Sequence, residues 1–329
     1  MFKWLLKHRS KPTPLELGIF DQKVSFWKPF LLFCPALLTT FLFTLVPFFL
    51  TLQKGFSHNE DIYRVDSQQF GFQTFANLFS ESNFILGLRN SFLYSIISLP
   101  LTIVLAIIIS SAIVFVYRKL ARGFWQTVFF LPYVTSGVAV SIAFIYILDS
   151  SSGILNNIFH VNIKWLDSGE RDTFNALWGI LIFGIWKNMA FNVLVISTAM
   201  LSVDPTLYKV ANLDGAKPIR QFFKITLPSI RPTLIFLLTL LILGGMQVFP
   251  ISLFNGNDSE AVTNGGSTIL LYIFQKIRDQ NNNFAGAATL VLFILGVCYG
   301  LVLRNGFRLI EWAQWKIKRH YVQTKLNLV

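Results

Sequence analysis

Three polar side chains interrupt one long apolar segment of the sequence, residues 175–200. Lys187, Asn188 and Asn192 occur in the stretch GIWKNMAFNV, and a helix would place the two asparagines, four residues apart, on one face. Amides bind hydroxyl groups, and an ammonium group binds a phosphate. We therefore expect a polar path for a solute here. The alternative is that these groups join neighbouring helices or, for Lys187, reach the membrane interface.

Weaker candidates for the same path lie in two other apolar segments. Gln247 follows Gly244-Gly245, whose small size would let a ligand or a helix approach closely. Helix packing is the equal alternative for this amide. Ser136 and Ser141 lie in the segment 126–148, but a serine in a helix commonly bonds its own backbone.

Motifs for catalysis by the chain itself are missing. Glycine is never followed by lysine, so no G-x-x-x-x-G-K-[ST] loop for phosphate exists. H-E-x-x-H and G-x-S-x-G are also absent, and the four histidines are scattered. We expect a protein that is not an enzyme and that binds no metal or cofactor, so that any ATP and Mg²⁺ would be bound by a partner.

The apolar segments contain essentially no carboxylates, and Asp149 lies only at the end of one of them. Ion-coupled transporters usually keep an ionisable acid at membrane depth. The absence of such an acid indicates that the energy for any transport comes from a source other than an ion gradient.

The elements that must position these residues are six apolar segments. The chain is 53% hydrophobic and only 13% charged, whereas soluble domains carry roughly 25% charged residues. Each segment is close to the length that crosses a ~30 Å hydrocarbon core. We expect an all-α polytopic membrane protein with helices at about 29–52, 91–116, 126–148, 175–200, 233–254 and 286–304.

The charges predict the orientation. The segments 1–28, 117–125, 201–232 and 305–329, with Arg304, hold 20 of the 28 basic residues but 5 of the 16 acidic ones. Because Lys and Arg favour the cytoplasmic side, both termini should be cytoplasmic, in the tails 1–28 and 305–329 around a membrane domain at 29–304. The outer segments would be 53–90, 149–174 and 255–285. The net positive charge of the chain then indicates contact with membrane lipid and not with nucleic acid.

A 25-residue polar stretch, 204–228, separates the fourth and fifth apolar segments. Asp204 and Pro205 are typical of a helix start, and Gly215 permits a turn. Pro218 is expected to open a second helix that Pro228 ends. The apolar residues of this stretch must bury against something, either their own bundle or a partner protein.

This stretch resembles the cytoplasmic loop of importer permeases of the ATP-binding-cassette type. Tyr208-Lys209-Val210-Ala211 stands where that family usually has Tyr-Glu-Ala-Ala, Asp214-Gly215-Ala216 follows in register, and Leu227-Pro228 closes the motif. Lys209 and Val210 depart from the family pattern. Weaker patches in the expected order, including 131–139, 153–156, 263–274 and 284–288, point to the carbohydrate subgroup, which imports maltose, other oligosaccharides and glycerol 3-phosphate.

The resemblance implies a coupling helix that docks on a separate ATPase, with seven residues matching the motif. These are Tyr208, Ala211, Asp214, Gly215, Ala216, Leu227 and Pro228. It also implies a second homologous permease, cytoplasmic ATP-binding subunits and an extracellular solute-binding protein in the plasma membrane complex. The alternatives are an ion-coupled secondary transporter or channel, and a membrane-embedded enzyme or assembly factor.

Overall fold

The computed structural model describes residues 27–59 and 68–326, and it forms two compact units, 1–50 and 51–329. Most of the predicted tail 1–28 therefore lies outside the described residues. Within them most residues are helical and almost none are in strands, as expected for an all-α protein.

The first unit is part of one long apolar helical stretch. It consists of α2 (Trp27–Thr40), the π-helical turn η2 (Phe41–Leu45) and the start of α3 (Val46–Gly55). The π turn lies just before Pro47, whose missing N–H and bulky ring interrupt ordinary helix hydrogen bonding. The whole stretch has 29 residues, long enough to cross a membrane, and it agrees with the predicted segment 29–52.

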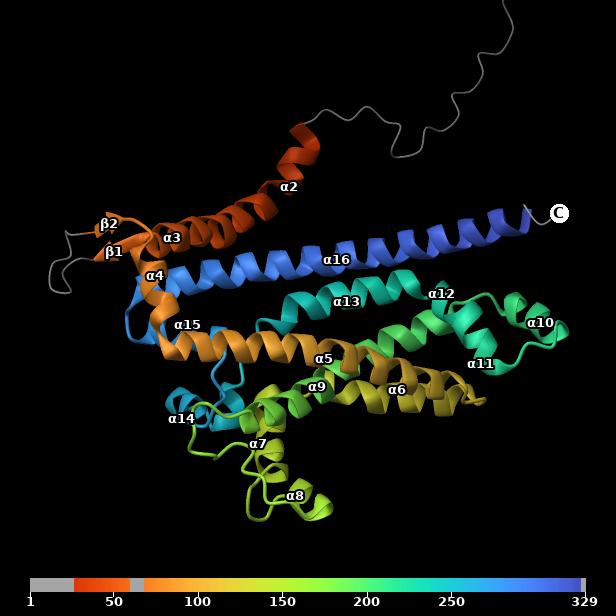
Figure 1. The fold of residues 1–329 in the computed structure, drawn as a ribbon, viewed down its shortest axis with the longest axis horizontal. Helices are drawn as coiled ribbons and strands as arrows, with labels where there is room; N and C mark the ends of the chain where they lie inside the picture. The colour runs from red at the N-terminus through yellow and green to blue at the C-terminus, as the bar shows by residue number, and fades with distance from the viewer. Residues whose placement is uncertain (1–26, 60–67, 327–329) are drawn as a thin grey trace, which may run out of the picture. The chain divides into compact units, whose positions relative to one another are not determined.

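The second unit is organised by five long helices, α5 (Ser82–Val114), α6 (Lys119–Val134), α9 (Asn175–Leu201), α13 (Arg231–Gly245) and α16 (Asn282–Leu326). α5 packs along α9, while α6 contacts α9 and α13 contacts α5 and α16 (Figure 1). The buried side chains between them form three apolar clusters, one of which fills the space between α5, α9 and α13.

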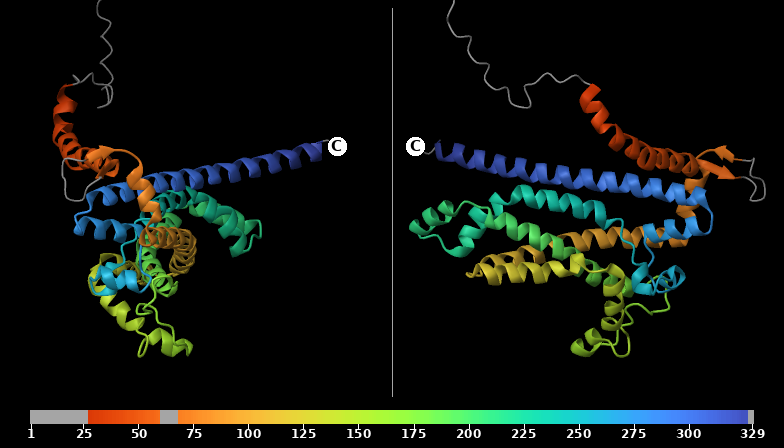
Figure 2. Two further views of the ribbon diagram at one scale, coloured as in Figure 1. Left: turned by 60° about the vertical axis from the view of Figure 1, so that its left-hand side comes forward. Right: turned by 180° about the vertical axis from the view of Figure 1, so that it is seen from behind.

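Shorter elements lie at the two ends of this bundle. One end carries α10 (Pro205–Leu213), α11 (Pro218–Gln221), the π turn η3 (Phe222–Thr226) and α12 (Leu227–Ser229). At the opposite end lie α7 (Gly137–Ile147), α8 (Ile154–Phe159), the 3-10 turn η4 (Ile251–Phe254) and α14 (Asp258–Thr263) (Figures 1 and 2). The remaining elements are α4 (Gln73–Ser80), α15 (Ile269–Arg278) and a two-stranded antiparallel ribbon of β1 (Ser57–Asn59) and β2 (Gln68–Phe70), in which Ser57 pairs with Phe70.

Two of the six predicted spans are not continuous helices. Four helices in the described residues are long and apolar enough to cross a membrane, and the number reaches six if each of two bent pairs counts as one span. The prediction of one helix over 126–148 is wrong, because α6 and α7 meet at 95°. The prediction over 233–254 is too long. α13 ends at Gly245, and the chain continues as turns with Pro250, which has no N–H to donate.

Buried polar bonds tie α5 to the loop before α15. The Asn90 side chain is buried and donates to the carbonyls of Gly265 (3.0 Å) and Ser267 (2.9 Å). Gly265 has φ +82°, and a Cβ there would come within 2.7 Å of Thr173 Cγ2. Gly265 is therefore needed for the conformation and close packing of this loop.

Replacing Asn90 with alanine should lower the stability of the folded chain. The change leaves two buried carbonyls without donors, and each lost hydrogen bond should lower the free energy of unfolding by about 1 kcal/mol. The melting temperature in lipid nanodiscs should therefore fall by several degrees. Asn157→Ala is the control, because Asn157 is exposed and makes one local bond of 3.2 Å to Ser152. Equal melting temperatures for the Asn90 variant and the parent would contradict this role.

Candidate functional site

The segment 204–229 begins with a well-formed helix start. Asp204 precedes Pro205 at the first helical position, and its Oδ1 accepts a hydrogen bond of 2.8 Å from the Thr206 N–H. This bond lowers the pKa of the Asp204 carboxyl, so the cap is ionised at neutral pH. The expected start of the helix is therefore confirmed.

The Asp214-Gly215-Ala216 triplet closes the same helix. The Ala216 N–H donates to the Ala211 carbonyl at 2.9 Å, and the Gly215 N–H donates to the Asn212 carbonyl at 3.0 Å. This pair of bonds is the Schellman motif, which needs a left-handed residue at the position of Gly215. Gly215 has φ +70°, as the motif requires, and no heavy atom of the described structure lies within 4 Å of where its Cβ would be. The glycine is therefore needed for backbone conformation and not for lack of space.

The segment has two arms, α10 and the stretch from α11 to α12, and side-chain hydrogen bonds join them. The hydroxyls of Tyr208 and Thr226 are 2.8 Å apart. Gln221 Nε2 donates to Asn212 Oδ1 at 2.6 Å and to the Ala216 carbonyl at 2.8 Å. We name residues 204–229 the coupling segment. Its second arm continues through Leu227 and Pro228 to Ser229, so Pro228 does not end it as predicted; the break is at Ile230.

Five apolar side chains of the coupling segment are exposed. Leu213 is 88% exposed and Ile219 is 75% exposed, and Leu207, Val210 and Phe223 are exposed as well. Tyr208 and Thr226 are instead turned inward, where they lie beside Ser111 of α5, Phe115 just after the end of α5, and Met200 of α9. Phe222 packs back onto the apolar cluster between α5, α9 and α13, whereas the five exposed side chains do not fold back onto the bundle. Lys209, the departure from the family pattern, is exposed and has no ion-pair partner in the described part of the chain.

A small cavity lies between α5, α6, α9 and α13. Its volume is about 170 Å³. Its polar lining comes from Tyr94 and Ser98 of α5, Tyr133 of α6, and Asn188 and Asn192 of α9. Ligand pockets usually begin at about 300 Å³, so this packing of the helices does not hold an oligosaccharide.

Asn192 has unused hydrogen-bonding capacity at this cavity. It is 3% exposed, and its Nδ2 donates to the Asn188 carbonyl at 2.8 Å. Its Oδ1 is buried and has no partner in the described structure. Buried acceptors are nearly always bonded to protein or water, so this oxygen is an available acceptor for a hydroxyl group.

The other predicted path residues lie outside the cavity lining. Lys187 is half-buried midway along α9, and a Cβ added at Gly137 would come within 2.4 Å of its Nζ. Ser136 is exposed at the bend between α6 and α7. Gln247, expected deep in a span, lies just after the end of α13 and is exposed. Ser141 bonds the Gly137 and Val138 carbonyls of its own helix, as its alternative reading expected.

Sequence reasoning missed three of the polar residues that line the cavity. Tyr94, Ser98 and Tyr133 are single hydroxyl-bearing residues in apolar segments, without a periodic pattern to distinguish them from packing residues. The Tyr94 hydroxyl has the side chains of Asn188 and Ser98 as hydrogen-bonding neighbours. The spacing of Asn188 and Asn192 in α9 predicted only one wall of the cavity.

Comparison with known proteins gives consistent matches over most of the chain. Residues 98–308 match the family described as binding-protein-dependent transport system inner membrane component. A probable ABC transporter permease protein of Mycoplasma genitalium is 75% identical over 328 residues, covering 100% of both chains. The sn-glycerol-3-phosphate transport system permease protein UgpA of Yersinia pestis is 24% identical over 281 residues, 82% of this chain and 91% of UgpA.

A solved structure has a similar fold. It is a bacterial alginate ABC transporter in complex with an alginate pentasaccharide-bound periplasmic protein. One of its chains matches with a TM-score of 0.67 and 25% identity, over 84% of this chain and 92% of that one. The helical fold predicted from the sequence is therefore the fold of ABC transporter membrane subunits.

Replacing Tyr208 with phenylalanine should loosen the coupling segment without unfolding the bundle. Loss of the hydrogen bond to Thr226 should lower the free energy of local opening of the segment by about 1 kcal/mol, so amide hydrogen exchange in α10 should become about fivefold faster. Tyr117→Phe is the matched control, since Tyr117 is 98% exposed and has no hydrogen bond among the described residues. Unchanged exchange in the Tyr208 variant would show that the two arms are held by other contacts.

Proposed function

The chain belongs to the family of binding-protein-dependent transport system inner membrane components and is a permease subunit of an ABC importer, and we propose that its coupling segment transmits the work of a separate ATPase to a solute path. The chain is a transport subunit in this proposal and does not itself hydrolyse ATP. ATP and Mg²⁺ would be held by the partner ATPase, because the sequence has no phosphate-binding loop.

One observation carries the proposal. The coupling segment is internally bonded, yet it leaves the apolar side chains of Leu207, Val210, Leu213, Ile219 and Phe223 exposed. Exposed apolar residues on a rigid element mark a protein-binding surface. Tyr208, Ala211, Asp214, Gly215, Ala216, Leu227 and Pro228 would shape this element, and the apolar side chains would enter a groove on the ATPase.

Movement of the coupling segment would be passed to the membrane helices. Its inner surface lies against the ends of α5 and α9, and its second arm leads through Ile230 directly into α13. α5, α9 and α13 also line the small cavity. Motion driven by ATP would therefore open this cavity in turn to each side of the membrane, an alternating-access cycle.

The solute we propose is a carbohydrate or a glycerol-phosphate-like compound. Asn188, Asn192 and Tyr94 offer hydroxyl-binding groups at the cavity, and relatives are described as permeases for sn-glycerol 3-phosphate and alginate. Ser136, Lys187 and Gln247 would join the path only when the helices or a second, homologous permease move, because they do not line the cavity.

The orientation we propose places both termini and the coupling segment in the cytoplasm of a multi-pass plasma membrane protein. The coupling segment and the segments 149–174 and 255–285 lie at opposite ends of α5 and α9, in accord with the charge distribution (Figure 2). The outer end would then receive solute from an extracellular binding protein.

The rival function is ion-coupled transport or a channel. It differs in its energy source, so uptake in vesicles driven by an ion gradient without any ATPase would overturn the proposal. Turnover of a substrate by the purified chain alone would instead favour an enzyme.

A substitution series at Gly215 tests the coupling segment. Valine rarely adopts a positive φ, which costs about 1–2 kcal/mol or more, whereas asparagine tolerates it. In vesicles with the complete transporter, Gly215→Val should reduce ATP-driven uptake about tenfold, and Gly215→Asn should keep most of it. Gly123→Val is the control, because Gly123 lies in α6 with equally open space around it. Normal uptake by the Gly215→Val variant would refute the assignment.

A substitution at Asn188 tests the path. Leucine has a similar size but cannot hydrogen-bond, so Asn188→Leu should lower uptake of a hydroxyl-rich solute severalfold or change the preference between sugars and glycerol 3-phosphate. Asn282→Leu, at the exposed start of α16, serves as the control. If a panel of radiolabelled solutes is taken up identically by the parent and the Asn188 variant, this side chain does not contact the solute.

A further inference from the structure

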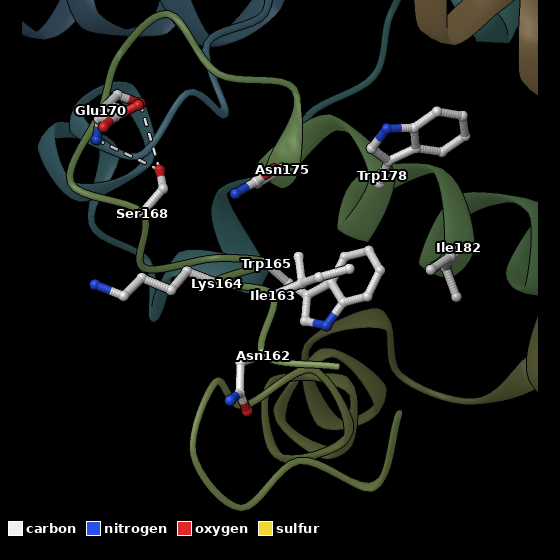
Figure 3. Close-up of a pocket in the computed structure, with 9 residues that line it drawn as sticks. All are labelled: Asn162, Ile163, Lys164, Trp165, Ser168, Glu170, Asn175, Trp178 and Ile182. Atoms are coloured by element: carbon white, nitrogen blue, oxygen red, sulfur yellow. Dashed lines mark hydrogen bonds between the residues drawn. The ribbon is translucent and has the colours of Figure 1, made fainter. Parts of the chain in front are cut away.

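A second and larger cavity lies beside the outer half of α9. Its volume is about 690 Å³, within the range of about 300–1,000 Å³ typical of ligand pockets. It is lined by Asn162, Ile163, Lys164, Trp165, Ser168, Glu170, Asn175, Trp178 and Ile182 (Figure 3). None of these residues lines the small cavity, whose first residue on α9 is Asn188, six positions and about 9 Å beyond Ile182.

The loop wall that carries Trp165 is held in place without any ligand. Asn156 is buried, and its Nδ2 donates to the carbonyls of Ser150 (3.0 Å) and Ile163 (2.9 Å). Its Oδ1 accepts a bond of 2.8 Å from the Trp165 indole N–H. The indole edge is therefore fixed, and its ring forms part of the cavity wall.

The wall formed by residues 168–170 is fixed by the loop before α15. The Gly169 N–H donates to Asn264 Oδ1 at 2.8 Å, and Ser168 Oγ donates to the Asn264 carbonyl at 3.2 Å. Between the two loop walls, Leu166 is buried against Gly179 of α9, where a Cβ would come within 3.2 Å of its Cδ2. The cavity is thus preformed.

The third wall is one face of α9. Asn175, Trp178 and Ile182 are three and four residues apart, so the helix brings them to the same side, where all three line the cavity. Trp178 is 49% exposed, and among the described residues its side chain has neither an aromatic partner nor a hydrogen bond. A large apolar ring left open in a cavity is available for stacking.

Four polar side chains at the cavity have no hydrogen-bond partner among the described residues, unlike Ser168 and Trp165. In the described part of the chain, the side chains of Asn162, Lys164, Glu170 and Asn175 make no hydrogen bond. The positive charge of Lys164 and the negative charge of Glu170 balance each other, so the cavity does not select for a strongly charged ligand. Two indole rings and several free hydrogen-bonding groups suit a molecule with apolar C–H faces and many hydroxyls.

We propose that the cavity between residues 162–170 and the start of α9 is a binding site for a saccharide-type ligand, separate from the path through the helices. Binding there does not depend on the proposed transport function. A role of this site in binding solute before transport does rest on the proposed function, since that role requires this end of the bundle to face the outside of the cell.

The test is direct binding to the full chain in lipid nanodiscs, without ATP or partner subunits. Saturation-transfer NMR with maltotriose as the probe should give a signal for the parent chain. Trp178→Ala should weaken binding about tenfold or more, as loss of an aromatic anchor does, while Trp178→Phe should retain most of it. Trp125→Ala is the matched control, because Trp125 is 44% exposed on α6 and does not line the cavity.

Two further variants separate this site from the path. Asn175→Ala should weaken maltotriose binding, and Asn188→Leu should leave it unchanged. Loss of binding in Asn188→Leu with full binding in Trp178→Ala would place the saccharide in the small cavity and overturn the proposal. No binding by the parent chain at millimolar maltotriose would overturn it as well, while leaving ATP-driven uptake to be judged by the Gly215 series.

Discussion

The close approach of α5 and α9 determines where the rest of the second unit can lie. At Gly184 a Cβ would come within 2.0 Å of the Tyr94 hydroxyl oxygen, so only glycine leaves room for the buried tyrosine against α9. Nearer the coupling segment, Ser110 Oγ donates to the Val193 carbonyl at 3.0 Å. This pair of helices lines the small cavity, meets the coupling segment at one end and holds the Asn90 contact at the other. Small and hydroxyl-bearing residues are the usual means of bringing membrane helices together.

Local rules predicted the elements whose causes are local. Asp204, Pro205 and Gly215 set the limits of α10 through bonds within one or two turns, so capping preferences were sufficient to predict them. The bend between α6 and α7 could not be predicted, because it goes with a tertiary contact in which Lys187 occupies the space beside Gly137. The same holds for the small cavity: amide spacing indicated Asn188 and Asn192, but the opposite walls come from α5 and α13, far away in the sequence.

The buried amides of the chain divide into two kinds. Asn90, Asn156 and Asn264 use their donors or acceptors to hold loops against helices, and their role is structural. Asn192 has a buried oxygen next to the cavity for which the described residues offer no partner. Amino-acid type does not separate these cases, since all four are asparagines. The distinction depends on which bonds the fold has already satisfied.

The Schellman turn at Gly215 has a consequence for how quickly a partner can engage the coupling segment. Its conformation is maintained by bonds within the segment itself, so a binding partner meets a finished shape on every encounter. Ordering entropy is then not lost at the moment of association, and encounter is not delayed by a folding step. In the transport cycle that we propose, such a surface would suit a contact that changes in every turnover, because the segment would not have to refold each time.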